Sequence, residues 1–326
     1  MTRTIGVDIG GTKVLGVVLD PGADAPTALA ETRRPTPRGP AALVTTIVEV
    51  VDELRATPEG RDVGAVGIGL PGLVDHDGIL RMGPNLPGVV DLDVRETVAA
   101  AVGWPVVVDN DANCAAWAEH RVGAARGHDH ALLVTLGTGI GGGIVAGGRL
   151  LRGGHGMAGE PGHMVVDPRG PRCPCGQRGC WERYASGTGL GLLGREAALA
   201  GRADAVVALA GGDPEAVRGE HVTTAARAGD RGARSVVEEF AWWVALGLAN
   251  LVAVLDPDVV VLGGGLAEEA DLVLEPTRRA FEGLVLAAAH RPVVAVHAAR
   301  SGERAGAVGA ALLAAERGWG ADEANR

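Results

Sequence analysis

An apolar strand, a glycine-rich turn and a second apolar strand occur in this order twice in the sequence of 326 residues. Residues 4–20 read TIGVDIGGTKVLGVVLD, and residues 130–151 read HALLVTLGTGIGGGIVAGGRLL. Alternation of apolar and small residues around the glycines predicts a strand, a turn and a strand in each case. We interpret the two copies as an internal duplication. Because the chain is also long enough for two domains, the pattern favours two related lobes over one sheet.

Helix and strand patterns alternate along the rest of the chain, which indicates the α/β class. Helices are expected over 41–57 and 95–102, with a loosely helical region from 187 to about 228, and a buried strand is expected within 63–75. Residues 104–121 are expected to run from a strand into a helix, 256–268 from a buried strand through a glycine-rich turn into a helix, and 291–319 from a strand through a hinge into a helix. Residues 109–111, Asp-Asn-Asp, separate a strand pattern from a helix pattern. These acids are therefore expected at the carboxyl end of a strand and at the start of a helix.

The composition excludes several classes of protein. With a net charge of -10 and a pI near 5.4, the chain offers no broad basic surface for nucleic acid. The N-terminal residues contain no apolar segment of signal-peptide length, so a cytoplasmic location is expected. The longest apolar run, Phe240 to Leu255, is shorter than a membrane span and is interpreted as a buried helix. Four cysteines in a reducing compartment favour thiol or metal chemistry over disulfides.

Three glycine-rich turns follow apolar strands, at Gly10 to Lys13, Gly137 to Gly143 and Gly263 to Gly265. Any one of them could be an ordinary hairpin turn. Together they favour phosphate binding, because successive backbone N–H groups in such turns can surround anionic oxygens. The chain contains no GxxxxGK[ST] pattern and no G-x-G-x-x-G that opens a helix, so P-loop and Rossmann sites are disfavoured.

Three acids follow predicted strands and are candidates for chemistry. Asp8 precedes the Gly-Gly-Thr-Lys turn, where a carboxylate could organise the water shell of Mg²⁺ or could simply cap the turn. Asp109 and Asp111 are candidate general bases, since phosphoryl transfer to an alcohol uses a carboxylate that accepts the hydroxyl proton. The alternative for both is helix N-capping, and Asp111 could do both.

Three of the four cysteines lie within eight residues, as Cys173-x-Cys175-x4-Cys180. These thiolates could supply most of a tetrahedral zinc site, and the fourth ligand could come from His155, His163 or Cys114. His163 is the nearest of these along the chain. A closed Cys3His shell has no open position, so the metal would be structural. The alternatives are a hydrophilic loop or a redox pair, although a C-x-C disulfide would be strained.

The motifs VDIGGTK, NDANCAAWAE, LGTGIGGGIV, EPGH, CPCGQRGCWE and LDPDVVVLGGGL together resemble the ROK family of repressors, open reading frames and sugar kinases, and specifically its glucokinases. They occur in the family's order from residue 5 to about 310. The resemblance implies the actin-like, ribonuclease-H-like ATPase duplication. It implies two α/β lobes with mixed sheets and an interlobe cleft, a small lobe of 1–113 with 304–326 and a large lobe of 114–303.

The resemblance also implies an ATP- and Mg²⁺-dependent hexose kinase with structural zinc. ATP phosphates would be held by the first and second glycine turns and the adenosine by the third. The residues concerned are Asp8, Gly10, Gly11, Thr12, Lys13, Gly137, Thr138, Gly139, Gly264 and Gly265. Asp111 would be the base that accepts the proton from the sugar's O6. Sugar contacts would come from Gly72, Asn85, Asn110, Asp111, Glu160, His163 and Glu182. The implied metal ligands are His163, Cys173, Cys175 and Cys180.

In this interpretation His163 binds metal through one ring nitrogen and a sugar hydroxyl through the other. Glu160 could be a solvated loop acid, but its i, i+3 relation to His163 favours a site. The expected partner is glucose or a related hexose, without nucleic acid or membrane, in a homo-oligomer such as a dimer or tetramer. The alternatives are a kinase for mannose, fructose or N-acetylmannosamine, a polyphosphate donor, and a sugar-responsive repressor, which the acidic chain disfavours.

Overall fold

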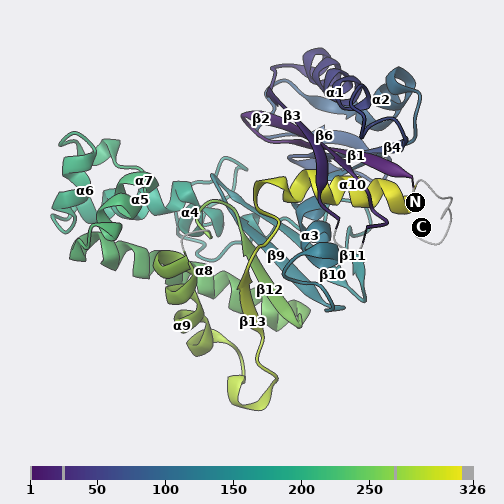
Figure 1. Ribbon diagram of the computed structural model, residues 1–326. Helices are drawn as coiled ribbons and strands as arrows, with labels where there is room; N and C mark the ends of the chain where they lie inside the picture. The colour runs from purple at the N-terminus through teal and green to yellow at the C-terminus, as the bar shows by residue number, and fades with distance from the viewer. Residues whose placement is uncertain (1, 24–25, 268–269, 318–326) are drawn as a thin grey trace. The chain divides into compact units, whose positions relative to one another are not determined.

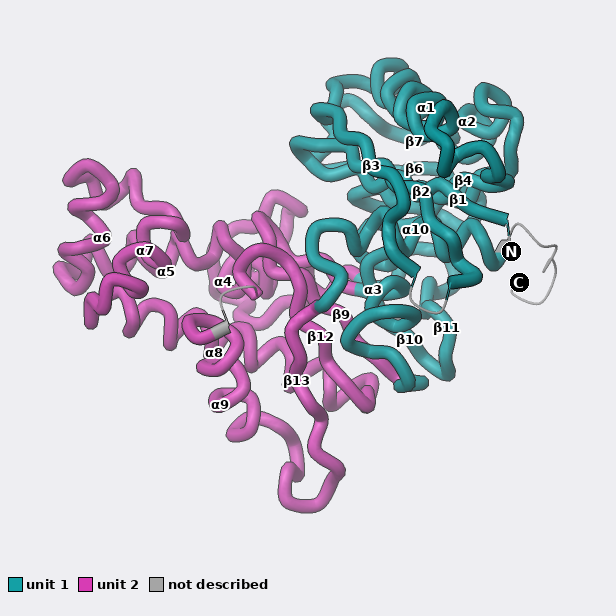
Figure 2. The backbone as a smooth tube through the Cα atoms, viewed as in Figure 1, with its two compact units in different colours: residues 1–129, 143–159, 300–326 teal, residues 130–142, 160–299 magenta. Residues whose placement is uncertain are grey.

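The computed structural model describes residues 2–23, 26–267 and 270–317. The chain divides into two compact units (Figure 2): unit 1 contains residues 1–129, 143–159 and 300–326, and unit 2 contains 130–142 and 160–299. These limits differ from the expected lobes, because 114–129, 143–159 and 300–303 pack within unit 1. The last residues of the expected small lobe, 318–326, lie outside the described residues.

The sheet of unit 1 has the strand order β3-β2-β1-β4-β8. Strands β1, β2 and β3 pair antiparallel, whereas β4 and β8 extend the sheet in parallel. The strands are β1 Arg3–Ile9, β2 Lys13–Leu19, β3 Ala28–Pro35, β4 Val63–Leu70 and β8 Val106–Asn110. A smaller antiparallel sheet of the same unit contains β5 Leu73–Val74, β6 Ile79–Met82 and β7 Val90–Asp93. The strand, turn and strand predicted for residues 4–20 are confirmed.

Helices α1 Pro40–Arg55 and α2 Val94–Val102 share one hydrophobic core with the strands of unit 1. Helices α3 Asp111–Val122 and α10 Ala305–Arg317 pack on each other, and α10 contacts β1 and β4 directly (Figure 1). Glycines permit this approach. A Cβ atom at Gly6 of β1 would lie 1.9 Å from the carbonyl oxygen of Ala307, and one at Gly67 of β4 would lie 1.9 Å from that of Ala310.

The second five-stranded sheet has the order β11-β10-β9-β12-β13. Its strands are β9 Ala131–Leu136, β10 Ile140–Ala146, β11 Arg149–Leu150, β12 Val259–Gly263 and β13 Ala295–Ala298. Strands β9, β12 and β13 pair in parallel, and β11 pairs antiparallel with β10. The unit boundary falls within β10, after residue 142. The order repeats that of the first sheet, strand for strand, so the duplication inferred from the sequence and the mixed α/β fold class are confirmed.

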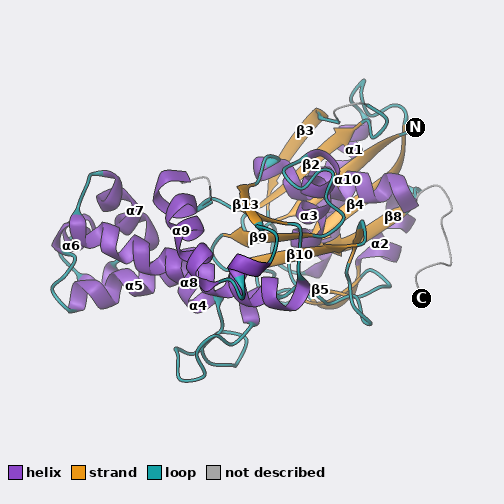
Figure 3. Cartoon of the chain, turned by 90° about the horizontal axis from the view of Figure 1, so that it is seen from below, coloured by secondary structure: helices purple, strands orange, loops and turns teal. Residues whose placement is uncertain are grey.

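Most helices of unit 2 group around the long helix α8 (Figure 3). They are α4 Glu182–Ala185, α5 Gly187–Leu199, α6 Asp204–Leu209, α7 Gly219–Arg227, α8 Arg231–Leu255 and α9 Glu275–Leu284. Short helical turns occur at Pro161–His163, Pro214–Ala216, Ala270–Leu274 and Ala288–His290, and in unit 1 at Gly302–Arg304. In the described part of the chain, α8 is the one helix long and apolar enough to cross a membrane, but 56% of its most apolar window is buried. This burial supports the predicted core helix.

Candidate functional site

The junction of β8 and α3 in unit 1 carries Asn110 and Asp111. Asn110 is the N-cap of α3: its Oδ1 accepts hydrogen bonds from the backbone N–H groups of Ala112 and Asn113, at 2.9 and 3.1 Å. Its Nδ2 donates to the carbonyl oxygen of Gly72 at 3.1 Å, which brings these two predicted sugar residues together. Asp111 is the first residue of the helix and is partly exposed. Asn110 supplies the N-cap of the helix, and Oδ1 of Asp111 also accepts a hydrogen bond from the backbone N–H of Ala112, at 2.8 Å.

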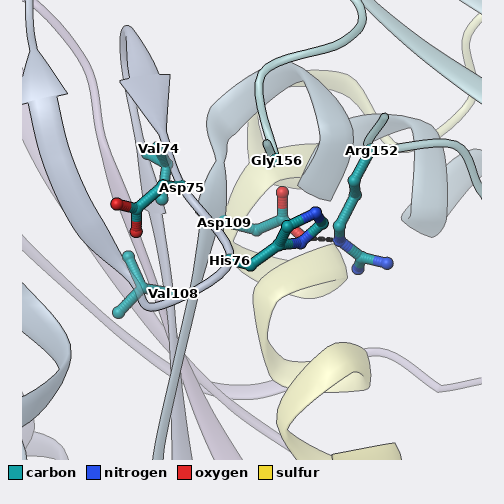
Figure 4. A pocket seen from close by; sticks show the side chains of 7 residues that line it. All are labelled: Val74, Asp75, His76, Val108, Asp109, Arg152 and Gly156. Atoms are coloured by element: carbon teal, nitrogen blue, oxygen red, sulfur yellow. Dashed lines mark hydrogen bonds and ion pairs between the residues drawn. The ribbon is translucent and has the colours of Figure 1, made fainter. Parts of the chain in front are cut away.

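The second candidate base, Asp109, lies in a different environment. It is buried, and its Oδ2 accepts from Nε of Arg152 at 2.7 Å (Figure 4). Its Oδ1 accepts from the backbone N–H of Asn110 and from Nδ2 of Asn113, both at 2.9 Å. A buried, ion-paired carboxylate with both oxygens engaged is poorly suited to accept a substrate proton. Asp109 is thus a weaker candidate for the base than its position in the sequence indicated, and Asp111 stays the predicted base.

The first glycine turn joins β1 to β2. The backbone N–H of Gly10 donates to the carbonyl oxygen of Lys13 at 2.8 Å, and Gly11 and Thr12 are exposed at the tip. Asn85 lies next to this tip, because a Cβ atom at Gly11 would be 3.6 Å from Cβ of Asn85. The predicted sugar residue Asn85 thus lies beside the predicted phosphate turn, whereas Gly72 lies beside Asn110.

Asp8 is held at the end of β1 against the first turn of α10. A Cβ atom at Gly306 would lie 2.4 Å from Oδ1 of Asp8, so any larger residue at 306 would displace this carboxylate. Burial raises the pKa of Asp8 to about 7, and the positive charge of Lys13 partly opposes this shift. A nearby cation would stabilise the ionised carboxylate further. Nζ of Lys13 itself lies 2.7 Å from Oε2 of Glu303, a residue that the sequence did not single out.

The second glycine turn joins β9 to β10, and a third follows β12, both in unit 2. The backbone N–H of Gly137 donates to the carbonyl oxygen of Gly139 at 3.0 Å, and Thr138 accepts a hydrogen bond from Oγ1 of Thr188 at 2.8 Å through its carbonyl. Gly264 has φ +82 and lies against Leu136, where the second turn begins; Gly265 is exposed beside it. Two predicted nucleotide-binding turns of unit 2 thus start from neighbouring parallel strands.

The cysteine segment of unit 2 forms a compact cluster with His163. The candidate ligand atoms of His163, Cys173, Cys175 and Cys180 all lie within 4.8 Å of one another. The Sγ atoms of Cys175 and Cys180 are 3.5 Å apart, and Sγ of Cys173 is 3.8 Å from Nδ1 of His163. Zinc bound tetrahedrally to sulfur at about 2.3 Å separates its ligand atoms by about 3.8 Å, so the cluster fits zinc.

The other two candidates for the fourth ligand lie outside this cluster. His155 is an exposed loop residue, and Cys114 is fully buried in α3, where burial raises the pKa of its thiol. Both belong to unit 1. The structure thus groups His163 with the three cysteines, as the spacing along the chain indicated.

The acids predicted to bind the sugar flank this cluster. Glu160 precedes the helical turn Pro161–His163, and burial raises the pKa of its carboxyl group. Glu182 begins α4; its Oε1 lies 3.0 Å from Sγ of Cys173 and 3.7 Å from Nδ1 of His163. Its Oε2 would be 2.8 Å from a Cβ atom at Gly139. Glu182 therefore lies between the cysteine cluster and the second glycine turn.

Comparisons with known proteins agree with these features. The model of the ROK family matches residues 4–317. The chain belongs to the ROK family. This ROK protein is 43% identical to a glucokinase of Streptomyces coelicolor. The alignment covers 97% of this chain and 98% of that protein.

Solved ROK structures share its fold. A ROK family glucokinase of Streptomyces griseus in complex with glucose and AMPPNP superposes with a TM-score of 0.83 at 42% identity, over 96% of this chain and 99% of that one. A ROK hexokinase of Thermus thermophilus superposes with a TM-score of 0.78 at 37% identity, over 97% and 98%. The expected ROK fold is therefore confirmed.

Sequence reasoning missed two charged residues of this ROK protein that contact predicted site residues. Arg152 pairs with Asp109 across 43 positions of sequence, and Glu303 pairs with Lys13 across 290. Neither residue belongs to a motif that carried the resemblance. The sequence offered no signal for either residue, because the burial that indicates a partner for Arg152 is visible only in the structure.

Proposed function

We propose that this ROK protein is a glucokinase that transfers the γ-phosphoryl group of ATP to O6 of glucose. The observation that carries the proposal is the β8–α3 junction, where Asn110 caps the helix and holds Gly72 while Asp111 stands first in the helix. A positioned carboxylate of this kind is what an alcohol acceptor requires. Relatives along nearly the whole chain support the choice of sugar and donor, since one is a glucokinase in complex with glucose and AMPPNP.

In the proposed reaction, Asp111 accepts the proton of the O6 hydroxyl as O6 attacks the γ-phosphorus. The bond between the γ-phosphorus and the bridging oxygen breaks, and ADP leaves with that electron pair. The backbone N–H groups of the two glycine turns and the side chains of Thr12 and Lys13 hold the phosphates, and Gly264 and Gly265 flank the adenosine. Asp8 would hold the water shell of Mg²⁺, and the ion would supply neutralisation of the phosphate charge.

Sugar hydroxyls are assigned to Asn110, Glu160, His163 and Glu182, with Gly72 and Asn85 as weaker contributors. Zinc, when bound by His163, Cys173, Cys175 and Cys180, supplies a fixed scaffold and takes no part in the chemistry. Nδ1 of His163 faces the cysteines, so its Nε2 is the nitrogen assigned to a hydroxyl. A cytoplasmic location is supported by four cysteines that are free in the structure. A homo-oligomer also stays a prediction.

A coupled assay of the purified full-length protein tests the proposal. Glucose, mannose, fructose and N-acetylmannosamine are each supplied with MgATP or with polyphosphate. We expect glucose with MgATP to give the highest kcat/KM and the product to be glucose 6-phosphate. A higher kcat/KM for another sugar, or for polyphosphate, would replace that part of the proposal, and a lack of phosphorylation of every sugar would refute the kinase assignment.

A further inference from the structure

An ion pair adjoins Asn110 and Asp111, the residues assigned to sugar binding and catalysis. Arg152, in the loop after β11, and Asp109, near the end of β8, expose only 15% and 6% of their side chains, and their Nε–Oδ2 distance is 2.7 Å. Figure 4 shows the arginine reaching Asp109 beside His76 and Gly156 in a small polar pocket of unit 1. Nothing in the proposed reaction uses this pair. Asp109, however, directly precedes Asn110 in the sequence and is two residues from Asp111.

We propose that Asp109 and Arg152 are positioning residues that fix the Asn110–Asp111 turn for catalysis, an inference that rests on the proposed function. Three donors converge on the carboxylate of Asp109: the backbone N–H of Asn110, the amide of Asn113 and the guanidinium of Arg152. An ionised carboxylate can accept all three, because it has no donor of its own. The backbone of Asn110 is thereby held from one side while its own side chain caps α3.

The loop that leads from Arg152 to Glu160 is held by contacts of its own backbone. The carbonyl oxygen of Arg152 accepts from the backbone N–H of Ala158 at 3.0 Å, which closes the loop on itself. The ring Nε2 of His76 lies 2.9 Å from the carbonyl oxygen of Gly153. Gly156, with φ +86, packs so closely on His76 that a Cβ atom would lie 2.7 Å from its backbone nitrogen. Glu160, assigned to a sugar hydroxyl, follows this loop directly.

The three hydrogen-bond donors around Asp109 allow a test of this positioning role by substitution. Asparagine at 109 would present an NH₂ group to at least one of the three donors, so Asp109→Asn should disturb the turn. Glutamine at 152 has its amide atoms at the same distance along the side chain as Nε of arginine. In the double variant D109N/R152Q, the amide NH₂ of residue 109 can therefore donate to the amide oxygen of residue 152, while its oxygen keeps the bonds from Asn110 and Asn113.

The experiment measures kcat, both KM values and Tm for wild type, D109N, R152Q and D109N/R152Q, at a temperature well below every Tm. The matched control is Arg149→Gln, an identical change at an exposed position three residues away. We expect D109N to lower kcat by about 10- to 100-fold, because small displacements of a catalytic group have costs of this size. KM for MgATP should stay within about 2-fold. D109N/R152Q should recover kcat to within about 3-fold of wild type.

Two results would overturn the proposal: D109N with the kcat of wild type, or a stable double variant with a kcat no higher than that of D109N. A purely structural pair would give kcat values that follow Tm and no rescue specific to the amide pair. If D109N does not fold, R152M replaces it, since Met has no donor; R152Q should then exceed R152M in kcat by about 5-fold, and equal values would refute the inference. An inactive wild type would instead refute the proposed function.

Discussion

Sγ of Cys173 lies 3.0 Å from Oε1 of Glu182. Through this contact a predicted metal ligand directly adjoins a carboxylate assigned to the sugar, and His163 belongs to both groups. The loop of Cys173 to Cys180 is short and is tied by its own backbone, with the N–H of Cys173 donating to the carbonyl oxygen of Gln177 at 2.9 Å. Metal binding and sugar binding are therefore expected to be coupled in this protein.

Removal of the metal should weaken sugar binding before it affects the nucleotide. Cys175→Ser, at the exposed cysteine of the cluster, is expected to lower the zinc content from about one ion per chain to near zero. The KM for glucose should rise by about 10- to 100-fold, as is typical when the surroundings of a metal site are disturbed. Metal analysis and steady-state kinetics measure both quantities. Cys114→Ala, in α3, is the control, and an unchanged KM in the zinc-free protein would disprove the coupling.

Asp111→Asn should abolish most turnover and leave the fold intact. Loss of a general base lowers kcat by about 10²- to 10⁴-fold. Tm should change little, because Asn110 and not Asp111 provides the N-cap of α3. Asp93→Asn, which alters the capping acid of α2 outside the site, is the comparison and should retain kcat. If Asp111→Asn kept full activity, another residue would have to be the base.

Asp8 should make stability depend on pH. The ordinary pKa of an aspartate is 3.8, and burial raises the pKa of Asp8 to about 7 in the folded chain. Well below pH 3.8 the carboxyl group is protonated in both the folded and the unfolded chain, so it does not change the stability. As the pH rises from about 4 to 7, only the unfolded chain loses the proton freely, so wild type is destabilised relative to Asp8→Asn by at most about 1.4 kcal/mol per pH unit.

Urea unfolding of both proteins at pH 5 and pH 8, without nucleotide, measures this effect. The stability difference should be larger at pH 8, in favour of the asparagine variant. Asp62→Asn, a change at an exposed acid, serves as the reference for a carboxyl group in solvent. A difference that is the same at both pH values would show that Asp8 keeps an ordinary pKa in the folded chain.

Glu303→Gln should improve nucleotide binding. Glu303 accepts hydrogen bonds from Lys13 and Arg33, which lower its pKa to about 2, so it stays ionised at working pH. Lys13 has to leave this partner to meet a phosphate. Because the pair is exposed, the expected fall in KM for MgATP is modest, up to about 5-fold, with Tm unchanged. Glu53→Gln, which breaks a similar exposed pair with Arg34, should leave KM unchanged, and a rise in KM for E303Q would show that Glu303 supports Lys13.

Sequence by itself determined the local structure around the motifs. The strands on either side of both glycine turns, the start of α3 after Asp109 and Asn110, and the burial of the apolar run in α8 were all predicted correctly. Each depends on residues that are near neighbours in the chain, where a repeat of two or of 3.6 residues is directly visible. The small sheet of β5 to β7 was missed, since its strands are only two to four residues long.

Tertiary structure decided which of these residues act together. Asp109 and Asp111 look equivalent in the sequence, but in the structure Asp109 pairs with Arg152 whereas Asp111 accepts a hydrogen bond from the backbone of Ala112. His163 joined the cysteines while Cys114 remained in the core, and the unit boundaries moved away from the expected lobe limits. Such outcomes depend on contacts between segments far apart in the chain. No local periodicity encodes those contacts, because they arise only when the sheets and helices pack.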